Sequence, residues 1–196
     1  MAVLMLLEWE GTTTDQYDAV NRAMGVTGDG DAPDGLVSHA IAVTDDGSLM
    51  VADVWESPEA LQTFVEQRLS GALREVGIPE AHPRVLPVHA HLRGRGEPGV
   101  MVVIEIPDAS SDVYDEMAAE MPAHAGDGSN HPAHTHAIAV DGDSLVVVDV
   151  WGSAKEFQKF AQEQIGPAGQ RHGMGEMDVA IHPIHTTIRG ATAAKS

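Results

Sequence analysis

Histidine is unusually frequent in this sequence, with 11 histidines among 196 residues and no cysteine. Two histidine pairs recur in register: His39 and His136 stand 97 residues apart, and His89 and His185 stand 96 residues apart. Because an imidazole titrates close to neutral pH, such side chains suit general acid–base chemistry. We therefore name all four as candidate catalytic residues. The alternative is that each imidazole hydrogen-bonds a neighbouring carboxylate or the backbone and only stabilises the sheet.

A second repeated pattern combines an acid with an aromatic side chain. Asp53-Val-Trp55 and Asp149-Val-Trp151 each end an apolar run. A buried carboxylate needs a partner, and a histidine is the obvious one. The indole rings fit a hydrophobic lid where a strand meets a helix. We expect all four side chains to contribute to substrate binding, with a purely structural role as the alternative for the tryptophans.

The second half of the chain carries further histidines. In the run His131-Pro-Ala-His134-Thr-His136, the side chains of His134 and His136 project from one face if the segment is a strand. Together with His185 they form a candidate site for a divalent transition metal. The first half has Val37 where the second has His134, so a metal should prefer the second half. The alternative is a polar, histidine-rich loop and rim.

These residues are positioned by an internal repeat that contains one single-residue gap. Each copy predicts a strand, a helix, two strands joined by a tight turn, a second helix and a last strand. Tyr17-Asp18 and Tyr114-Asp115 recur in register, and both tyrosines fall on helix stripes that belong in the core. This order favours an α+β fold of two tandem ferredoxin-like βαββαβ modules, residues 1–94 and 100–190, joined by a short Gly/Pro-rich connector.

A single module of this kind would leave one face of its antiparallel sheet uncovered as a large apolar patch. We therefore expect the two sheets to pack into one α/β barrel. Small residues such as Ala40 and Ala42 suit the sheet face under the helices, which would turn His39 and His136 toward the barrel interior. The same alternation in the last strands predicts that the other candidate pair faces the interior as well.

Charge and composition exclude several classes of partner. The formal net charge is −19, and such a surface repels nucleic acid phosphates and anionic lipids. The sequence contains no recognisable signal peptide or membrane-spanning segment, so we expect a cytoplasmic protein. The expected partner is a small-molecule ligand, with neither nucleic acid nor membrane. The expected assembly is a monomer with an internal barrel or a homodimer of it.

One segment resembles a known superfamily. The string from Asp53 to Ala60 (Asp-Val-Trp-Glu-Ser-Pro-Glu-Ala), followed by Phe64, is similar to the strand–Trp–Glu–Ser–helix signature of the dimeric α/β-barrel superfamily. This superfamily includes antibiotic-biosynthesis monooxygenases, haem-degrading monooxygenases and stress-responsive barrel proteins. The resemblance covers almost the whole chain, once per half, and implies that two tandem copies form the barrel that two subunits form elsewhere.

The resemblance also implies a function. We expect a cofactor-independent monooxygenase-type enzyme that acts on an aromatic or polyketide-like substrate, whose electron-rich anion reacts with oxygen directly. The alternatives are a non-catalytic metal-, haem- or ligand-binding barrel and a stress-induced structural protein. The expected cofactor is none, or a divalent transition metal. Haem degradation is disfavoured, because Phe64 and Phe160 replace the family's tryptophan, and Arg74 and Gln170 replace its histidine.

Overall fold

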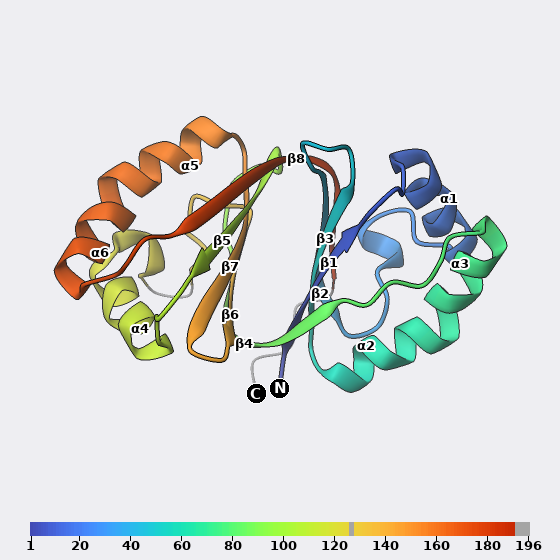
Figure 1. Ribbon diagram of the computed structural model, residues 1–196, viewed down its shortest axis with the longest axis horizontal. Helices are drawn as coiled ribbons and strands as arrows, with labels where there is room; N and C mark the ends of the chain where they lie inside the picture. Colours follow the sequence, from blue (N-terminus) through green and yellow to red (C-terminus); the bar gives the residue numbers. More distant parts are fainter. Residues whose placement is uncertain (126–127, 191–196) are drawn as a thin grey trace. The chain divides into compact units, whose positions relative to one another are not determined.

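The computed structural model describes residues 1–125 and 128–190, and the chain divides into two compact units (Figure 1). Within the described residues, the first unit comprises Met1–Leu86 and residues 184–190, and the second lies between Pro87 and Pro183. The division falls inside two strands, so each unit contains the end of a strand that began in the other. The repeats, expected at 1–94 and 100–190, and the compact units are thus two different divisions of the chain.

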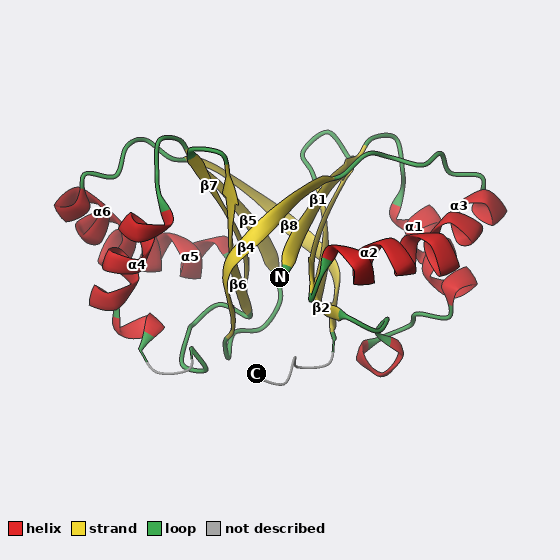
Figure 2. Ribbon diagram, turned by 90° about the horizontal axis from the view of Figure 1, so that it is seen from below, coloured by secondary structure: helices red, strands yellow, loops and turns green. Residues whose placement is uncertain are grey.

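Both halves contain the predicted order of elements. In the first half these are β1 (Val3–Trp9), α1 (Thr14–Met24), the 3-10 turn η1 (Asp29–Asp31), β2 (Leu36–Val43), β3 (Leu49–Trp55), α2 (Pro58–Phe64), the π-helical turn η2 (Val65–Leu69), α3 (Ser70–Val76) and β4 (Arg84–Arg93). In the second half they are β5 (Val100–Ile106), α4 (Ser111–Glu120), the 3-10 turn η3 (Pro122–His124), β6 (Thr135–Asp141), β7 (Ser144–Trp151), α5 (Ala154–Phe160), the π-helical turn η4 (Ala161–Ile165), α6 (Gly166–His172) and β8 (Asp178–Arg189). In each unit the α-helices cover one face of the strands (Figure 2). Within the described residues, no helix is long and apolar enough to cross a membrane.

The strands pair in the order β1-β3-β2-β8-β5-β7-β6-β4, which closes on itself as a barrel. In it β4 pairs with β6, and β8 pairs with both β2 and β5, all antiparallel. The end of β4 therefore lies in the second unit and the end of β8 in the first. The predicted α+β class and the closed antiparallel barrel are confirmed.

Helix α1 is defined by signals at both of its ends. Thr13 and Gln16 form a capping box at its start. Gly25 follows its last turn at φ 70°, in the left-handed conformation that favours glycine. These signals fix the register of the helix and place Tyr17 on its buried face. Helix α4 buries Tyr114 in the same way.

The predicted direction of the second-strand histidines is wrong. Ile41 packs with Tyr17 in the core between the sheet and the helices of the first unit. His39 lies on that same sheet face, since it hydrogen-bonds the Tyr17 hydroxyl. Alternation along the strand then places Ala40 and Ala42 on the opposite face. The prediction assigned small residues to the helix side, but the inner face of a closed barrel is narrow and also takes small side chains.

Candidate active site

Three side chains of the first unit form a continuous hydrogen-bonded chain. Strands β2 and β3 place His39 directly opposite Asp53, and His39 Nδ1 lies 2.6 Å from Asp53 Oδ1. On the other side of the ring, Nε2 lies 2.6 Å from the hydroxyl oxygen of Tyr17, which α1 supplies. All three side chains are largely buried. The fold thus joins a carboxylate, an imidazole and a phenol from three elements.

The hydrogen bonds determine which atoms of this chain carry protons. The carboxylate of Asp53 only accepts, so His39 Nδ1 donates to it, and in the neutral ring Nε2 keeps a lone pair. The Tyr17 hydroxyl therefore donates to Nε2. Burial raises the pKa of Tyr17 well above its ordinary value, and the negative charge of Asp53 adds to this effect. Tyr17 accordingly remains protonated, and His39 is oriented as a base behind it.

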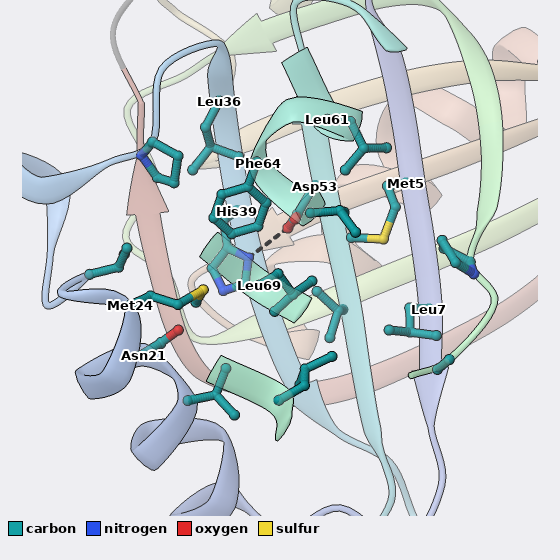
Figure 3. Close-up of a pocket in the computed structure, with 18 of the residues that line it drawn as sticks. Met5, Leu7, Asn21, Met24, Leu36, His39, Asp53, Leu61, Phe64 and Leu69 are labelled. Atoms are coloured by element: carbon teal, nitrogen blue, oxygen red, sulfur yellow. Dashed lines mark hydrogen bonds and ion pairs between the residues drawn. The ribbon is translucent and has the colours of Figure 1, made fainter. Parts of the chain in front are cut away.

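A cavity of about 250 Å³ lies beside the hydrogen-bonded chain, between the sheet and the helices of the first unit (Figure 3). Tyr17, His39 and Asp53 all contribute to its wall. The rest of the wall is mostly apolar and includes Met5, Leu7, Met24, Val51, Trp55, Leu61, Phe64, Leu69 and Ile188. An apolar cavity with a few convergent polar groups is typical of a small-molecule site.

The π-helical turn η2 interrupts the helix that borders this cavity. It joins α2 to α3, and its Val65 and Leu69 side chains line the cavity. The turn η4 joins α5 to α6 in the same way. Such wide turns inside helices are frequent at functional sites. Sequence reasoning missed them because an apolar stripe with helical spacing does not reveal a single wide turn.

The second unit repeats the hydrogen-bonded chain with small differences. His136 Nδ1 lies 2.6 Å from Asp149 Oδ1, and its Nε2 lies 2.9 Å from the Tyr114 hydroxyl oxygen. The indole N–H of Trp151 donates to Asp149 Oδ2 at 3.1 Å. The equivalent N–H of Trp55 has no acceptor within the described part of the chain. Both repeats therefore build the same acid–imidazole–phenol chain, but only the second adds the indole to it.

Two further histidines lie next to His136, and neither of them has a histidine counterpart in the first repeat. The ring centroids of His124, His131 and His136 lie 4.9 to 5.1 Å from one another. Burial, together with a smaller effect of the nearby His136, lowers the pKa of His131 to about 3 and that of His124 to about 4. These two imidazoles are therefore neutral near pH 7.

The other candidate pair is His89 and His185, and each of these histidines lies in the unit formed mainly by the other repeat. His185, near the end of β8, lies in the first unit with Nε2 2.9 Å from Asp18 Oδ1. Its ring meets the Tyr17 ring edge-on at a centroid distance of 5.8 Å. His89 lies in the second unit, with Nε2 2.7 Å from Asp115 Oδ1, and meets the tyrosine of that unit edge-on. Both imidazoles reach helix residues, so the predicted interior direction is wrong for this pair as well.

A β-bulge at each of these two histidines explains the error. The register of β4 with β6 passes over His89, and the register of β8 with β2 passes over His185. A bulge turns a side chain out of strict alternation and is common near active sites. The available signal was a proline two residues earlier in both strands, Pro87 and Pro183, because proline inside a sheet is confined to edges and bulges.

Sequence reasoning also missed the role of the helix residues. It placed Tyr17 and Tyr114 in the core and assigned no partner to Asp18 or Asp115. In the structure, each tyrosine is the third member of a hydrogen-bonded chain. Asp18 hydrogen-bonds His185 of the second repeat, and Asp115 hydrogen-bonds His89 of the first repeat. The signal was the Tyr-Asp dipeptide that recurs in register in both repeats.

The predicted metal-binding set is not assembled. His134 Nδ1 donates to the backbone carbonyl of Gly96, His136 is held by its own two hydrogen bonds, and His185 binds Asp18 in the first unit. Among residues 1–125 and 128–190, no group of three histidine, cysteine or acidic side chains is arranged to hold a metal ion. The structure therefore does not bring these three histidines together.

Comparison with known proteins adds information about the fold. No protein family and no curated protein matches the sequence. Among solved structures, a proposed monooxygenase from Lactobacillus acidophilus NCFM superposes with a TM-score of 0.69 at 11% identity, covering 96% of each chain. A proposed monooxygenase from Fusobacterium nucleatum subsp. nucleatum ATCC 25586 gives a TM-score of 0.69 at 8% identity, covering 96% of this chain and 93% of that chain.

A third solved structure, an anthrone oxidase-like protein, superposes with a TM-score of 0.51 at 16% identity, covering 96% of this chain and 92% of that chain. At these identities the likeness concerns the fold alone. It agrees with the closed order of eight strands and with the repeated order of elements. The chain therefore shares the fold of these solved structures, and it supplies both repeats of that fold from one polypeptide.

Proposed function

We propose that the cavity of the first unit binds a small aromatic or polyketide-like molecule and that the protein oxygenates it without a cofactor. The observation that carries this proposal is the Asp53–His39–Tyr17 chain in the wall of a mainly apolar cavity. The apolar wall suits flat hydrocarbon rings, and the hydrogen-bonded chain supplies a group that accepts a proton from them.

Proton removal runs through Tyr17 to His39. The substrate gives its proton to the Tyr17 oxygen while the Tyr17 proton moves to His39 Nε2, across the 2.6 Å hydrogen bond. Tyr17 thus ends the step as a neutral phenol, in agreement with the burial that raises its pKa. The imidazolium formed on His39 is stabilised by the carboxylate of Asp53 at Nδ1.

The oxidation step balances with oxygen as the only co-reactant. A substrate methylene that has lost one proton donates an electron to O2, and the two radicals combine to a peroxide anion. The peroxide takes the proton back from His39. Loss of the second C–H proton then breaks the O–O bond, leaves a carbonyl and releases water. The net reaction is CH2 + O2 → C=O + H2O.

Anthrone is the substrate to test first, because one similar fold belongs to an anthrone oxidase-like protein. Turnover is measured as oxygen uptake and anthraquinone absorbance at pH 7, above the rate in buffer and with EDTA present. We expect His39→Ala to lower kcat/KM by about 10²- to 10⁴-fold, the usual contribution of a general base. Asp53→Asn and Tyr17→Phe should also lower it, since they disturb the ring orientation and the relay.

Matched variants separate catalysis from folding. His82→Ala, at an exposed histidine outside the cavity wall, should leave turnover and the melting temperature unchanged. His136→Ala tests separately whether the second unit takes part. Full activity in His39→Ala, or no turnover above the buffer rate, would contradict the proposal. Binding of anthrone without oxygen uptake would favour the non-catalytic ligand-binding barrel.

A further inference from the structure

The two units share a frame of three side chains around the paired histidines. In the first unit it consists of His39, Trp55 and Phe64, all of which line the cavity. The second unit has the equivalent set His136, Trp151 and Phe160. The Trp and Phe ring centroids lie 5.0 Å apart in the first unit and 5.1 Å apart in the second. A ring that lies between these three side chains therefore has the same aromatic neighbours in either unit.

In the second unit, a planar ring of the protein itself lies in this frame. The imidazole of His131 stacks on His136 at a centroid distance of 4.9 Å and an interplanar angle of 26°. It also lies 5.9 Å from the Trp151 ring and 5.6 Å from the Phe160 ring. His131 is only 1% exposed. In the second unit, the three side chains of the frame thus enclose the neutral, flat imidazole of His131, whose face stacks on His136.

In the first unit, the frame borders the 250 Å³ cavity instead. The residue in register with His131 is Asp34, which is exposed and does not contribute to the cavity wall. Beside it, the first unit has Leu36 where the second has Ala133. The first repeat therefore has no aromatic counterpart of His131 at this position.

We infer that the first unit binds a planar, neutral aromatic ring of its substrate in the place that the His131 imidazole occupies in the second unit. The ring of the ligand would stack on His39 and contact Trp55 and Phe64. This inference rests on the proposed function only in taking the cavity as the substrate site, and it holds whether or not the bound molecule is oxidised.

The arrangement around His131 also describes the ligand in more detail. Its Nδ1 accepts a hydrogen bond from the backbone N–H of Ala133, so Nε2 carries the proton, and that N–H has no acceptor within the described residues. This edge of the ring therefore makes no hydrogen bond to the described residues. The equivalent edge of the substrate ring is expected to be hydrocarbon, with the oxygen substituents on the side of Tyr17. One ligand should bind per chain, because His131 takes the second place.

Binding is tested with 1-naphthol, a flat probe that needs no turnover. Titration of protein labelled at histidine with ¹³C and ¹⁵N is followed by NMR, with assignment through single histidine variants. A ring stacked on His39 should shift the His39 ring-proton signals upfield by its ring current and leave those of His136 in place. Calorimetry should give one equivalent of 1-naphthol per chain.

Two variants borrowed from the other repeat provide the matched comparison. Leu61→Phe introduces into the cavity wall the residue that the second unit has at Phe157, and should weaken 1-naphthol binding by about tenfold or more. Phe157→Leu should leave the binding unchanged. His131→Ala should leave an empty space between His136, Trp151 and Phe160, and engineered apolar cavities of this kind bind small aromatic rings. This variant should therefore bind two equivalents of 1-naphthol per chain, and the ring-proton signals of His136 should shift as well.

The outcomes separate the inference from the proposed function. Upfield shifts of His39 with a Leu61→Phe effect support the stacked ring even if anthrone is never oxidised. Binding of 1-naphthol that leaves the His39 signals unmoved, or that Leu61→Phe does not weaken, overturns it even if anthrone is turned over. Should His131→Ala fail to fold, the wild-type titration and the Leu61→Phe comparison still decide the question.

Discussion

Replacing the buried His131 by phenylalanine should make the protein more resistant to acid. Phenylalanine keeps a flat ring between His136, Trp151 and Phe160 but cannot take up a proton. Burial holds the pKa of His131 at about 3, against 6.5 for an ordinary histidine. Because the folded-state pKa lies below the unfolded one, the unfolded chain binds the proton first as the pH falls. The stability contributed by a neutral His131 is therefore complete above about pH 6.5 and is lost as the pH falls toward 3.

The size of this effect follows from the two pKa values. At pH 5 an unfolded histidine of pKa 6.5 gains about 2 kcal/mol from protonation, whereas a folded histidine of pKa about 3 gains almost nothing. The wild type should thus lose about 2 kcal/mol between pH 8 and pH 5 through this residue alone. For a chain of this length, that corresponds to a shift of roughly 4 to 8 °C in melting temperature.

The assay is urea denaturation of both proteins at pH 8, 7, 6 and 5, with the free energy of unfolding plotted against pH. The curve of His131→Phe should be flatter than that of the wild type by about 2 kcal/mol at pH 5. His82→Asn, at an exposed histidine, serves as the control and should follow the wild type. Parallel curves for wild type and His131→Phe would refute the conclusion that His131 is buried in its neutral form.

Two further matched pairs test the packing around the candidate site. Trp151→Phe removes a buried hydrogen bond to a carboxylate and should lower the free energy of unfolding, measured by urea denaturation, by about 1–3 kcal/mol. Trp55→Phe should lower the free energy of unfolding by less, because the Trp55 indole N–H has no acceptor among the described residues. Gly35→Ala should be more destabilising than Gly47→Ala in the same assay, because both have positive φ but only at Gly35 would the new methyl group approach the Cβ of Ala60 to 2.6 Å. Equal losses within either pair would contradict the corresponding contact.

The architecture could be predicted because its signals are local and occur twice. Thr13 and Ser110 stand at the helix starts where capping residues are expected, and both act as N-caps. The apolar runs at the beginning of each repeat form β1 and β5. A sheet with one uncovered apolar face then leaves closure into a barrel as the stable arrangement. Neither step requires knowledge of which side chains meet.

The site could not be predicted to the same depth because it depends on where side chains point. A β-bulge at His89 and another at His185 turn both imidazoles toward the helices. A prediction that assumes strict alternation of side chains along a strand cannot anticipate such a bulge. The stacking of His131 on His136 is equally invisible in the sequence, where the run of alternating histidines suggests metal binding more readily than packing. Partner choice among eleven histidines is a property of the folded chain.

The joining of two repeats in one polypeptide accounts for the difference between the two units. In a symmetric dimer of identical modules, a residue such as His131 would enter both frames at once. In a tandem chain it enters one, so the second unit can hold a ring over His136 while the first keeps space beside His39. The strand ends are nevertheless exchanged, because His185 of the second repeat packs edge-on against Tyr17 in the first unit. The second repeat therefore contributes a packing contact to the hydrogen-bonded chain of the first unit.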